Sequence, residues 1–267
     1  MRGLANRATD PPAIPAAADM TLSLAATAEP AMPSPVTPAS RSSQRCQVCA
    51  ARRDCLIGQL PRPLLERLLP LVHERAFRKG ELLQSEGQPP PVLRSIKLGS
   101  VMLTRAGPDG MPRPVALVGR GHLLGLAALL GEQTQVGAQA VSAGRCCEVA
   151  PEPLRQLFAS DPALMADLHR HLLQTLARLA DWGQVMRLRG LPRQLMAALM
   201  LMADEQGSRV VQLPSQVTLA ALLATTRESV ARALRQLDDS GHLRRIDRWH
   251  GELTGTHRLI FNDGATR

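Results

Sequence analysis

The segment 160–188 constrains the fold most strongly, because its seam residues recur in alternating steps of four and three. Ser160 or Asp161 can cap a helix here, and Gly190 follows its end. The recurring residues are Met165, His169, Leu172, Leu176, Leu179, Gly183 and Met186, of which Leu172, Leu176, Leu179 and Met186 are the expected dimer contacts. This spacing is that of a coiled-coil seam, which is buried when two copies pair. We therefore expect a homodimer, although a helix of this length can also pack on its own chain.

The residues before this helix follow a different pattern. In residues 76–151, short apolar stretches alternate with Gly and Pro, which is typical of a compact antiparallel barrel or roll. Residues 61–70 predict a short helix with leucines on one face. Residues 1–44 are rich in Ala, Pro, Ser and Thr, and they predict a disordered tail. Because the aromatic content is 2% and tyrosine is absent, the core must be built from Leu, Val, Ala and Met.

The residues after the long helix predict a further helix, Leu191 to Asp204, and then two short helices around a turn. Thr218 is expected to cap the first short helix, Leu219–Leu223, and Thr226 the second, Arg227–Leu237. Two short strands would follow as a wing. Helix, turn and helix of this kind place the N-terminal residues of the second helix against base edges in the major groove of DNA.

The second short helix carries the residue types that read DNA. The residues at its N-terminal end are Arg227, Glu228, Ala231 and Arg232, and the residues expected near phosphates are Arg235, Arg244, Arg245 and Arg248. Arginine pairs with guanine, and glutamate accepts from the amino group of cytosine. A net charge of +9 suits an anionic partner. A charged, solvated helix face is the alternative interpretation.

Three cysteines lie within ten residues. Cys46, Cys49 and Cys55 are spaced C-x2-C-x5-C, and the chain has five cysteines in all. In a reducing cytosol, an odd and clustered set is typical of a metal or redox site rather than of disulfides. Zinc and iron–sulfur clusters both accept four thiolates, so the spacing alone leaves the metal open.

Several classes of protein are disfavoured by what the sequence lacks. No apolar run approaches the roughly 20 residues that cross a bilayer. The N-terminal residues lack the layout of a signal peptide, so we expect a cytoplasmic protein that does not enter the membrane. The chain has no Gly-rich nucleotide fingerprint and no Ser/His/Asp order, so we do not expect an enzyme.

A roll, a long helix and a winged helix-turn-helix in this order resemble the Crp/Fnr family of bacterial transcription regulators, over about residues 46–261. The stretch RESVARALRQLDDSGHL is similar to the family's recognition helix and the residues directly after it. By that match, Glu228 and Arg232 take the places of the family's base-reading residues. The resemblance implies a palindromic DNA site with TGA-containing half-sites, and RNA polymerase as a partner. Arg227 resembles the Crp branch, and Ala231 stands where the Fnr branch has Ser, so the outer bases stay open.

The resemblance implies an α+β fold. Its parts are an N-terminal β-roll sensor domain of the cyclic-nucleotide-binding, cupin-type kind, a long dimerisation helix and a C-terminal winged helix-turn-helix. The expected boundaries are a tail at 1–44, a cysteine-bearing segment and roll at 45–159, the dimerisation helix at 160–190 and the DNA-binding domain at 191–267.

Cyclic AMP is an improbable effector on the same comparison. The Crp branch holds the nucleotide's phosphate with a Gly-Glu turn and a downstream Arg-Ser. Here Leu126 takes the place of that Glu, and Val136 and Gly137 replace the Arg and Ser. A phosphate without its cation is poorly held. We therefore expect no cyclic nucleotide.

The Fnr branch instead binds a [4Fe-4S] cluster with three N-terminal cysteines and one in the roll. Cys46, Cys49 and Cys55 reproduce the Fnr spacing, and RCCEVAPEPL resembles the segment with the fourth ligand, which matches Cys147. The resemblance implies a regulator that senses oxygen or redox state and controls anaerobic or microaerobic gene expression. Cys146 would be a buried bystander or an alternative ligand. Zinc-bound cysteines, directly redox-active cysteines, and haem on His73 or His122 are the alternatives.

Two further expectations rest on the same comparison. Arg45, Arg52 and Arg53 are expected to lower the pKa of the thiols and to offset an anionic cluster. Leu179 stands where the Fnr branch has an acidic residue that keeps the metal-free form monomeric. A leucine strengthens the seam, so we expect the metal-free protein to remain dimeric.

Overall fold

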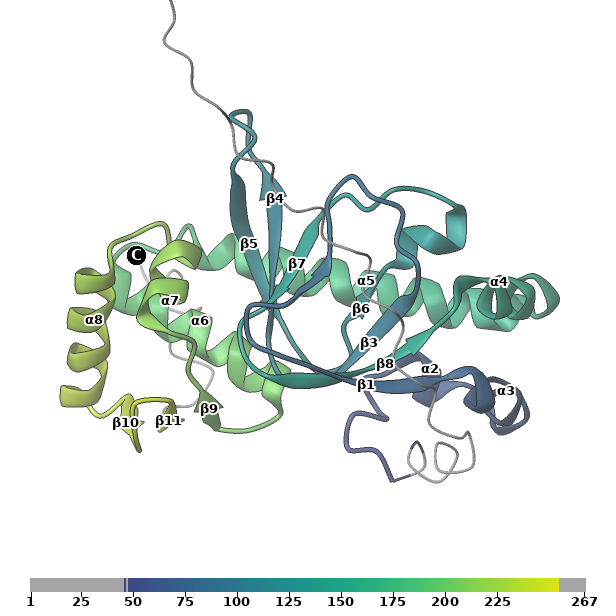
Figure 1. Cartoon of the computed structure of the whole chain (residues 1–267). Coiled ribbons are helices and arrows are strands. Elements are labelled where there is room, and N and C mark those ends of the chain that lie inside the picture. The colour runs from purple at the N-terminus through teal and green to yellow at the C-terminus, as the bar shows by residue number, and fades with distance from the viewer. Residues whose placement is uncertain (1–45, 47, 255–267) are drawn as a thin grey trace, which may run out of the picture. The chain divides into compact units, whose positions relative to one another are not determined.

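The computed structural model describes residues 46 and 48–254, which belong to one compact unit spanning residues 38–267. The tail predicted at 1–44, Arg45 and the residues predicted beyond 254 lie outside the described residues. None of the helices in the described part combines the length and the apolar character that crossing a membrane requires. Figure 1 shows a β-roll, a long helix, and a helical region with a small sheet.

The roll consists of two four-stranded sheets, ordered β1-β8-β3-β6 and β2-β7-β4-β5. The strands are β1 His73–Phe77, β2 Leu82–Gln84, β3 Leu93–Leu98, β4 Val101–Ala106, β5 Pro112–Val118, β6 Leu123–Leu124, β7 Gly137–Ala140 and β8 Gly144–Val149. Every pairing between them in the described residues is antiparallel. The predicted antiparallel roll is confirmed.

Strand β8 separates two hydrophobic cores, because successive residues of a strand point to opposite faces. Cys146 is fully buried in the core inside the roll, with Phe77 and Ile96. Cys147 packs against a second core on the outer face of the sheet, with Cys55 and Leu93. The two adjacent cysteines therefore serve different environments, and Cys147 is the one that meets the N-terminal segment.

The helices cover the outer face of the β1-β8-β3-β6 sheet and form the C-terminal region. They are α2 Leu56–Gln59, α3 Arg62–Leu68, η2 Leu69–Leu71, η3 Leu126–Leu130, α4 Pro151–Ser160, α5 Pro162–Val185, α6 Leu191–Gln206, α7 Gln216–Leu222 and α8 Arg227–Asp239. The wing sheet has the order β10-β11-β9, from β9 Val210–Gln212, β10 Leu243–Arg245 and β11 His250–Leu253. The predicted α+β class and the predicted helix from Leu191 are confirmed.

The long helix differs from its predicted bounds at both ends. Asp161 is its N-cap, and the Asp161 side chain accepts a hydrogen bond from the Ala163 backbone N–H. The alternative cap, Ser160, was wrong, since Ser160 is the last residue of α4. The helix ends at Val185 rather than at 188. Helix α4 was not predicted, and its prolines lie in the first helical turn, where proline is tolerated.

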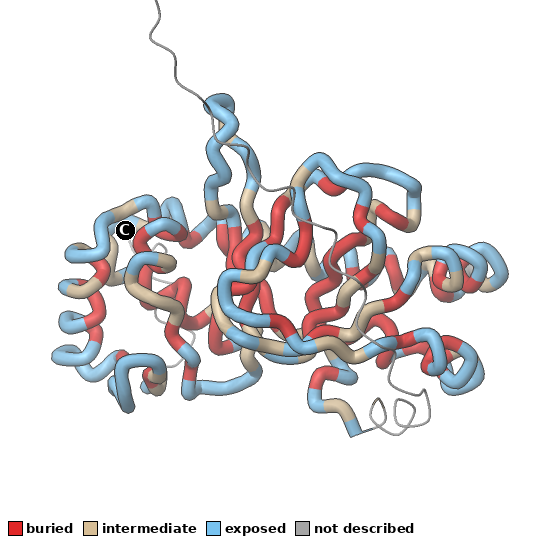
Figure 2. Tube along the Cα trace, viewed as in Figure 1, coloured by how far each residue is buried: buried red, intermediate tan, exposed pale blue. Residues whose placement is uncertain are grey.

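Helix α5 presents two faces. Its buried residues are Leu164, Leu168, His171, Trp182 and Val185, which pack on the chain's own cores. A second line, which we call the α5 stripe, is exposed and consists of Leu172, Leu176 and Met186. Leu179 lies beside it, partly buried against the chain's own core. Buried and exposed positions alternate along this helix. Figure 2 shows buried positions within the roll and exposed positions on its outer loops. One face of α5 therefore packs on its own chain, and the α5 stripe stays exposed for a second copy to cover.

Leu176 is 63% exposed, and it tests whether a second copy covers the α5 stripe. Leu176→Glu should weaken the dimer at least ~100-fold, because each copy loses about 1.5–3 kcal/mol of leucine burial. Sedimentation over a concentration series measures this. Ala177→Glu, on the exposed outer side of the same turn, should leave the dimer intact. Equal behaviour of the two variants would contradict the seam.

Candidate cysteine centre and DNA-reading helix

Four of the five cysteines line one cavity. Cys46, Cys49 and Cys55 come from the segment that precedes α2, and Cys147 comes from β8. The cavity has a volume of about 20 Å³, and the structure thus brings together all four of the sequence-predicted ligands. The segment from Cys46 to Cys55 is called the cysteine loop below. Cys55 is buried, whereas Cys46, Cys49 and Cys147 are half-buried.

Local hydrogen bonds give the cysteine loop its shape. The Cys49 N–H donates to the Cys46 carbonyl at 3.3 Å, and the Cys55 N–H donates to the Ala51 carbonyl at 3.0 Å. The loop then folds back on α2, where the Arg52 Nε donates to the Gly58 carbonyl at 3.2 Å. A side chain at Gly58 would meet the Arg52 carbonyl at 2.8 Å, so this close approach requires glycine.

Strand β3 supplies two polar groups that the sequence pattern did not single out. Ser95 is 3% exposed, and its hydroxyl lies 3.2 Å from the Cys55 sulfur. Lys97 lines the same cavity, and its Nζ is 3.0 Å from the Glu74 carboxylate. The two residues are two apart on one strand, so they share a face of the sheet. This alternation was the signal that could have identified them.

Burial and mutual repulsion dominate the ionisation of the thiols. Burial raises the pKa of Cys46, and the Cys55 and Cys49 charges raise it further, against the Lys97 and Arg52 charges that lower it. Burial raises the pKa of Cys147 to about 12, again helped by Cys55 and Cys46. The Arg52 charge lowers the pKa of Cys46, as expected, but burial and the neighbouring thiols outweigh it, so the net shift is upward. A cationic centre between the thiols would remove this penalty.

The donor set suits a four-thiolate centre, but the cavity between the thiols is small. Zinc at about 2.3 Å from four sulfurs needs those sulfurs about 3.8 Å apart. Within residues 46 and 48–254, no group of three or more His, Cys, Asp or Glu residues is arranged to hold a metal ion. A [4Fe-4S] cluster spreads its thiolates over separate irons and needs more room than one water-sized space. Cys55 belongs to the core on the outer face of the sheet, and Cys46 and Cys147 both pack against that core.

The remaining candidate ligands lie elsewhere. Cys146 is in the core inside the roll, where burial raises its pKa to about 11, so it is a bystander rather than an alternative ligand. His73 is exposed at the start of β1, and His122 is buried between β5 and β6.

The Gln84 side chain forms hydrogen bonds with the two segments that the family resemblance matches to a nucleotide's phosphate. The Gln84 Oε1 accepts from the Gly125 N–H at 2.7 Å, and the Gln84 Nε2 donates to the Val136 carbonyl at 2.8 Å. Leu126 opens η3 directly after Gly125. The buried Gln84 carboxamide thus links the segment at Gly125 to the segment at Val136.

The helix-turn-helix is present with a shifted first helix. Helix α7 begins at Gln216, and its cap is Ser215, whose hydroxyl accepts from the Thr218 N–H, so the predicted cap at Thr218 was wrong. Ala224 takes the left-handed turn conformation with φ 49°. Thr226 caps α8 by accepting from the Ser229 N–H at 3.2 Å, as predicted.

Helix α8 buries one face and exposes the other. The buried residues are Val230, Ala233, Leu234 and Leu237. The exposed face carries Arg227, Glu228, Arg232 and Arg235, with Ala231 half-buried beside them. These are the sequence-predicted DNA contacts, and they lie together on one face. In the wing, Arg248 stacks on Trp249 at 4.4 Å, with Lys79 of the roll at 5.4 Å from the same ring.

Comparison with known proteins agrees with this arrangement. Residues 74–161 match the cyclic nucleotide-binding domain family, and residues 193–259 match the Crp-like helix-turn-helix domain family. The transcriptional regulator SdrP of Thermus thermophilus is 28% identical over 176 residues, 63% of this chain and 84% of that protein. The structure of FixK2 from Bradyrhizobium japonicum has a TM-score of 0.63 at 22% identity, covering 73% of this chain and 99% of that one. The c-di-GMP responsive regulator CLP of Xanthomonas campestris has a TM-score of 0.56 at 21% identity, covering 73% and 100%.

A cyclic-nucleotide-binding type roll joined to a helix-turn-helix defines a DNA-binding transcription regulator, and its relatives are regulators and not enzymes. The chain belongs to the Crp/Fnr family. Regulators of this family bind DNA as dimers.

Two histidines are buried near the contact between the roll and α5. His122 is 4% exposed and His171 is 6% exposed. Burial, together with the smaller effects of the Arg178 and His171 charges, lowers the pKa of His122 to about 3. Burial and the Arg178 charge also lower the pKa of His171. Both histidines are therefore neutral in the folded protein at neutral pH.

This burial predicts an acid dependence of stability. His122 contributes fully above its unfolded pKa of about 6.5, and its contribution is lost as the pH falls toward 3, since only the unfolded chain then takes the proton. Urea unfolding at pH 7.0 and 5.5 should show a loss that is smaller in His122→Gln than in the parent, by on the order of 1 kcal/mol. The exposed His73→Gln should match the parent. An equal loss in all three proteins would refute the assignment.

Proposed function

We propose that this Crp/Fnr regulator senses oxygen or redox state through a [4Fe-4S] cluster held by Cys46, Cys49, Cys55 and Cys147. The observation that carries the proposal is that these four thiols, from two distant parts of the chain, line one cavity. Burial and the charges of neighbouring thiols raise the pKa of Cys46 and of Cys147. A cationic centre between the thiols would stabilise their charged forms.

The chain's own groups would hold and tune the centre. Ser95 can donate its hydroxyl to the Cys55 sulfur, and the Lys97 ammonium offsets negative charge in the cavity. Hydrogen bonds to the sulfurs and nearby charge are the usual means of setting a cluster's stability and potential. When bound, the cluster supplies the oxygen-labile link between the cysteine loop and the roll. Loss of that link frees the loop from β8.

We propose that the regulator takes no cyclic nucleotide. The Gln84 carboxamide occupies the Gly125 N–H that a phosphate would otherwise use. Neither Leu126 nor Val136 offers a positive charge to a phosphate. A buried phosphate without a charged donor is poorly held.

The output is a homodimer that places two α8 helices on a palindrome with TGA-containing half-sites, with RNA polymerase as the partner in gene control under low oxygen. The exposed face of α8 supports this interpretation. Dimers of helix-turn-helix proteins read half-sites about one helical turn apart.

Zinc or directly redox-active thiols are the second candidate, favoured by the narrow space between the thiols. Metal content separates these possibilities, because a cluster gives roughly four irons per chain, a zinc site one zinc, and redox thiols no metal.

Two adjacent cysteines provide a matched test of the cluster. Protein purified without oxygen should be brown and contain roughly four irons per chain. Cys147→Ala should lose most of the iron and the visible absorbance, since it removes one of four ligands. Cys146→Ala should keep both, because Cys146 lies inside the roll. Retention of iron by Cys147→Ala, or a colourless parent, would overturn the ligand set.

Helix α8 gives a second pair of variants. Glu228→Ala should cost about 1–3 kcal/mol of discrimination at the base pair it reads, with little change in the salt dependence of binding. Arg235→Ala should weaken all sequences alike and lower the salt slope by about one. Fluorescence anisotropy with a consensus site and single-base variants measures both. A uniform loss in Glu228→Ala would contradict base reading.

A further inference from the structure

Three residues between β5 and β6 join the cysteine loop to the DNA-binding region. We call residues 119–121, Gly-Arg-Gly, the strap. One side of the strap contacts the cysteine loop, and the other side contacts α6, the first helix after the long helix. On the side of the cysteine loop the contacts are an ion pair and close backbone packing, and on the side of α6 they include hydrogen bonds to Glu205.

On the side of the cysteine loop, the strap meets Asp54, the residue before Cys55. The Arg120 Nε lies 2.8 Å from the Asp54 carboxylate. A side chain at Gly121 would come within 2.4 Å of the Asp54 carbonyl oxygen, and Gly121 has φ +84°. Backbone therefore packs directly on backbone here, and the ion pair links the same loop residue to Arg120.

On the side of α6, the strap is fixed to the last helical turn. The Gly119 N–H donates to the Glu205 carboxylate at 2.8 Å, and the Arg120 N–H donates to the Glu205 carbonyl at 3.3 Å. The Arg120 guanidinium also sits against Gly207, where a side chain would come within 2.4 Å of it. A cation at this place is favoured by the negative end of the α6 dipole.

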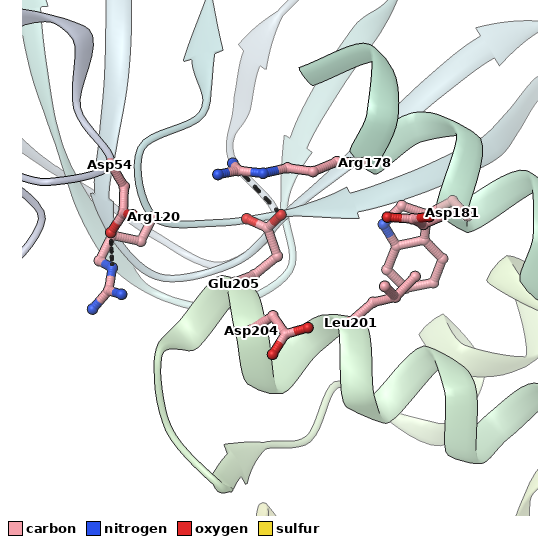
Figure 3. Close-up of a pocket in the computed structure, with 8 residues that line it drawn as sticks. Asp54, Arg120, Arg178, Asp181, Leu201, Asp204 and Glu205 are labelled. Carbon is pink, nitrogen blue, oxygen red and sulfur yellow. Dashed lines mark ion pairs between the residues drawn. The ribbon is translucent and has the colours of Figure 1, made fainter. Parts of the chain in front are cut away.

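Figure 3 shows Asp54, Arg120 and Glu205 among the residues that line a cavity of about 190 Å³. Glu205 points from α6 toward Arg178 of α5, with Arg178 Nη1 and the Glu205 carboxylate 3.8 Å apart. Burial raises the pKa of Glu205, against the lowering effect of Arg178 and the Gly119 N–H. Trp182 of α5 also lines the cavity. The cysteine loop, the roll, α5 and α6 thus all contribute to one junction.

We propose that Arg120 is a positioning residue that transmits the position of the cysteine loop, through Asp54, to the C-terminal end of α6. This inference rests on the proposed function, in which the loop changes position with the state of its thiols. Helix α6 packs against the recognition helix α8. A loop that is pinned holds Arg120 between Asp54 and Gly207, and a loop that is released frees the end of α6 and so changes the setting of α8.

The test compares DNA affinity without oxygen and after exposure to air. Asp54→Asn and Arg120→Gln should keep the iron and visible absorbance of the parent. The ratio of the two affinities should fall about fivefold or more in each variant, the scale of a typical coupling between sites. Asp109→Asn breaks an aspartate–arginine pair of similar length, Asp109 with Arg113 at 2.8 Å, in the β4–β5 hairpin, and it should keep the parent's ratio.

A second measurement needs no metal. Hydrogen exchange of the metal-free protein should be faster in peptides covering the strap and residues 201–207 in both junction variants, but not in Asp109→Asn. If the parent holds no iron and shows no response to air, the proposed function fails, and the exchange result alone decides on the strap. If Asp54→Asn loses iron, Arg120→Gln decides the affinity test. Unchanged ratio and unchanged exchange in Arg120→Gln would overturn the proposal.

Discussion

The outer face of the β1-β8-β3-β6 sheet is the surface on which the rest of the structure depends. Apolar residues of this face, with α2, α3, α4 and the start of α5, form one continuous core. That core fixes Cys55 beside Cys147 and fixes the cysteine loop beside the strap. The same sheet buries Cys146 on its other face, so one strand keeps the candidate ligand apart from its neighbour.

Charged groups at the cysteine centre repel one another, whereas those at the junction form ion pairs. The thiols resist ionisation because they are buried and close to one another. At the junction, Asp54 and Glu205 are each close to an arginine, which partly offsets the cost of burying charge. A change of charge at the thiols therefore acts on a loop whose Asp54 is held by an ion pair. The proposed route from the cysteines to α6 runs through this ion pair and the strap.

Local patterns predicted much of this molecule. The alternation of short strands and turns predicted the roll, and the Thr226 cap and small turn residue predicted the helix-turn-helix, because these depend on neighbouring residues. The four cysteines were placed together by resemblance to a family, and the structure brings them to one cavity. The predicted caps Ser160 and Thr218 were wrong, because a second residue that can cap stands close by in each case, and Asp161 and Ser215 cap the helices. Ser95, Lys97 and the strap were missed because their partners are distant in the sequence.

The most direct test of the central claim measures iron content and DNA affinity together in the unmodified protein, on a palindrome with TGA-containing half-sites. We predict that air removes the visible absorbance and weakens binding to this site in parallel, with the same time course. A protein that carries one zinc per chain, or whose DNA affinity stays constant while its iron is lost, would contradict the proposed mechanism.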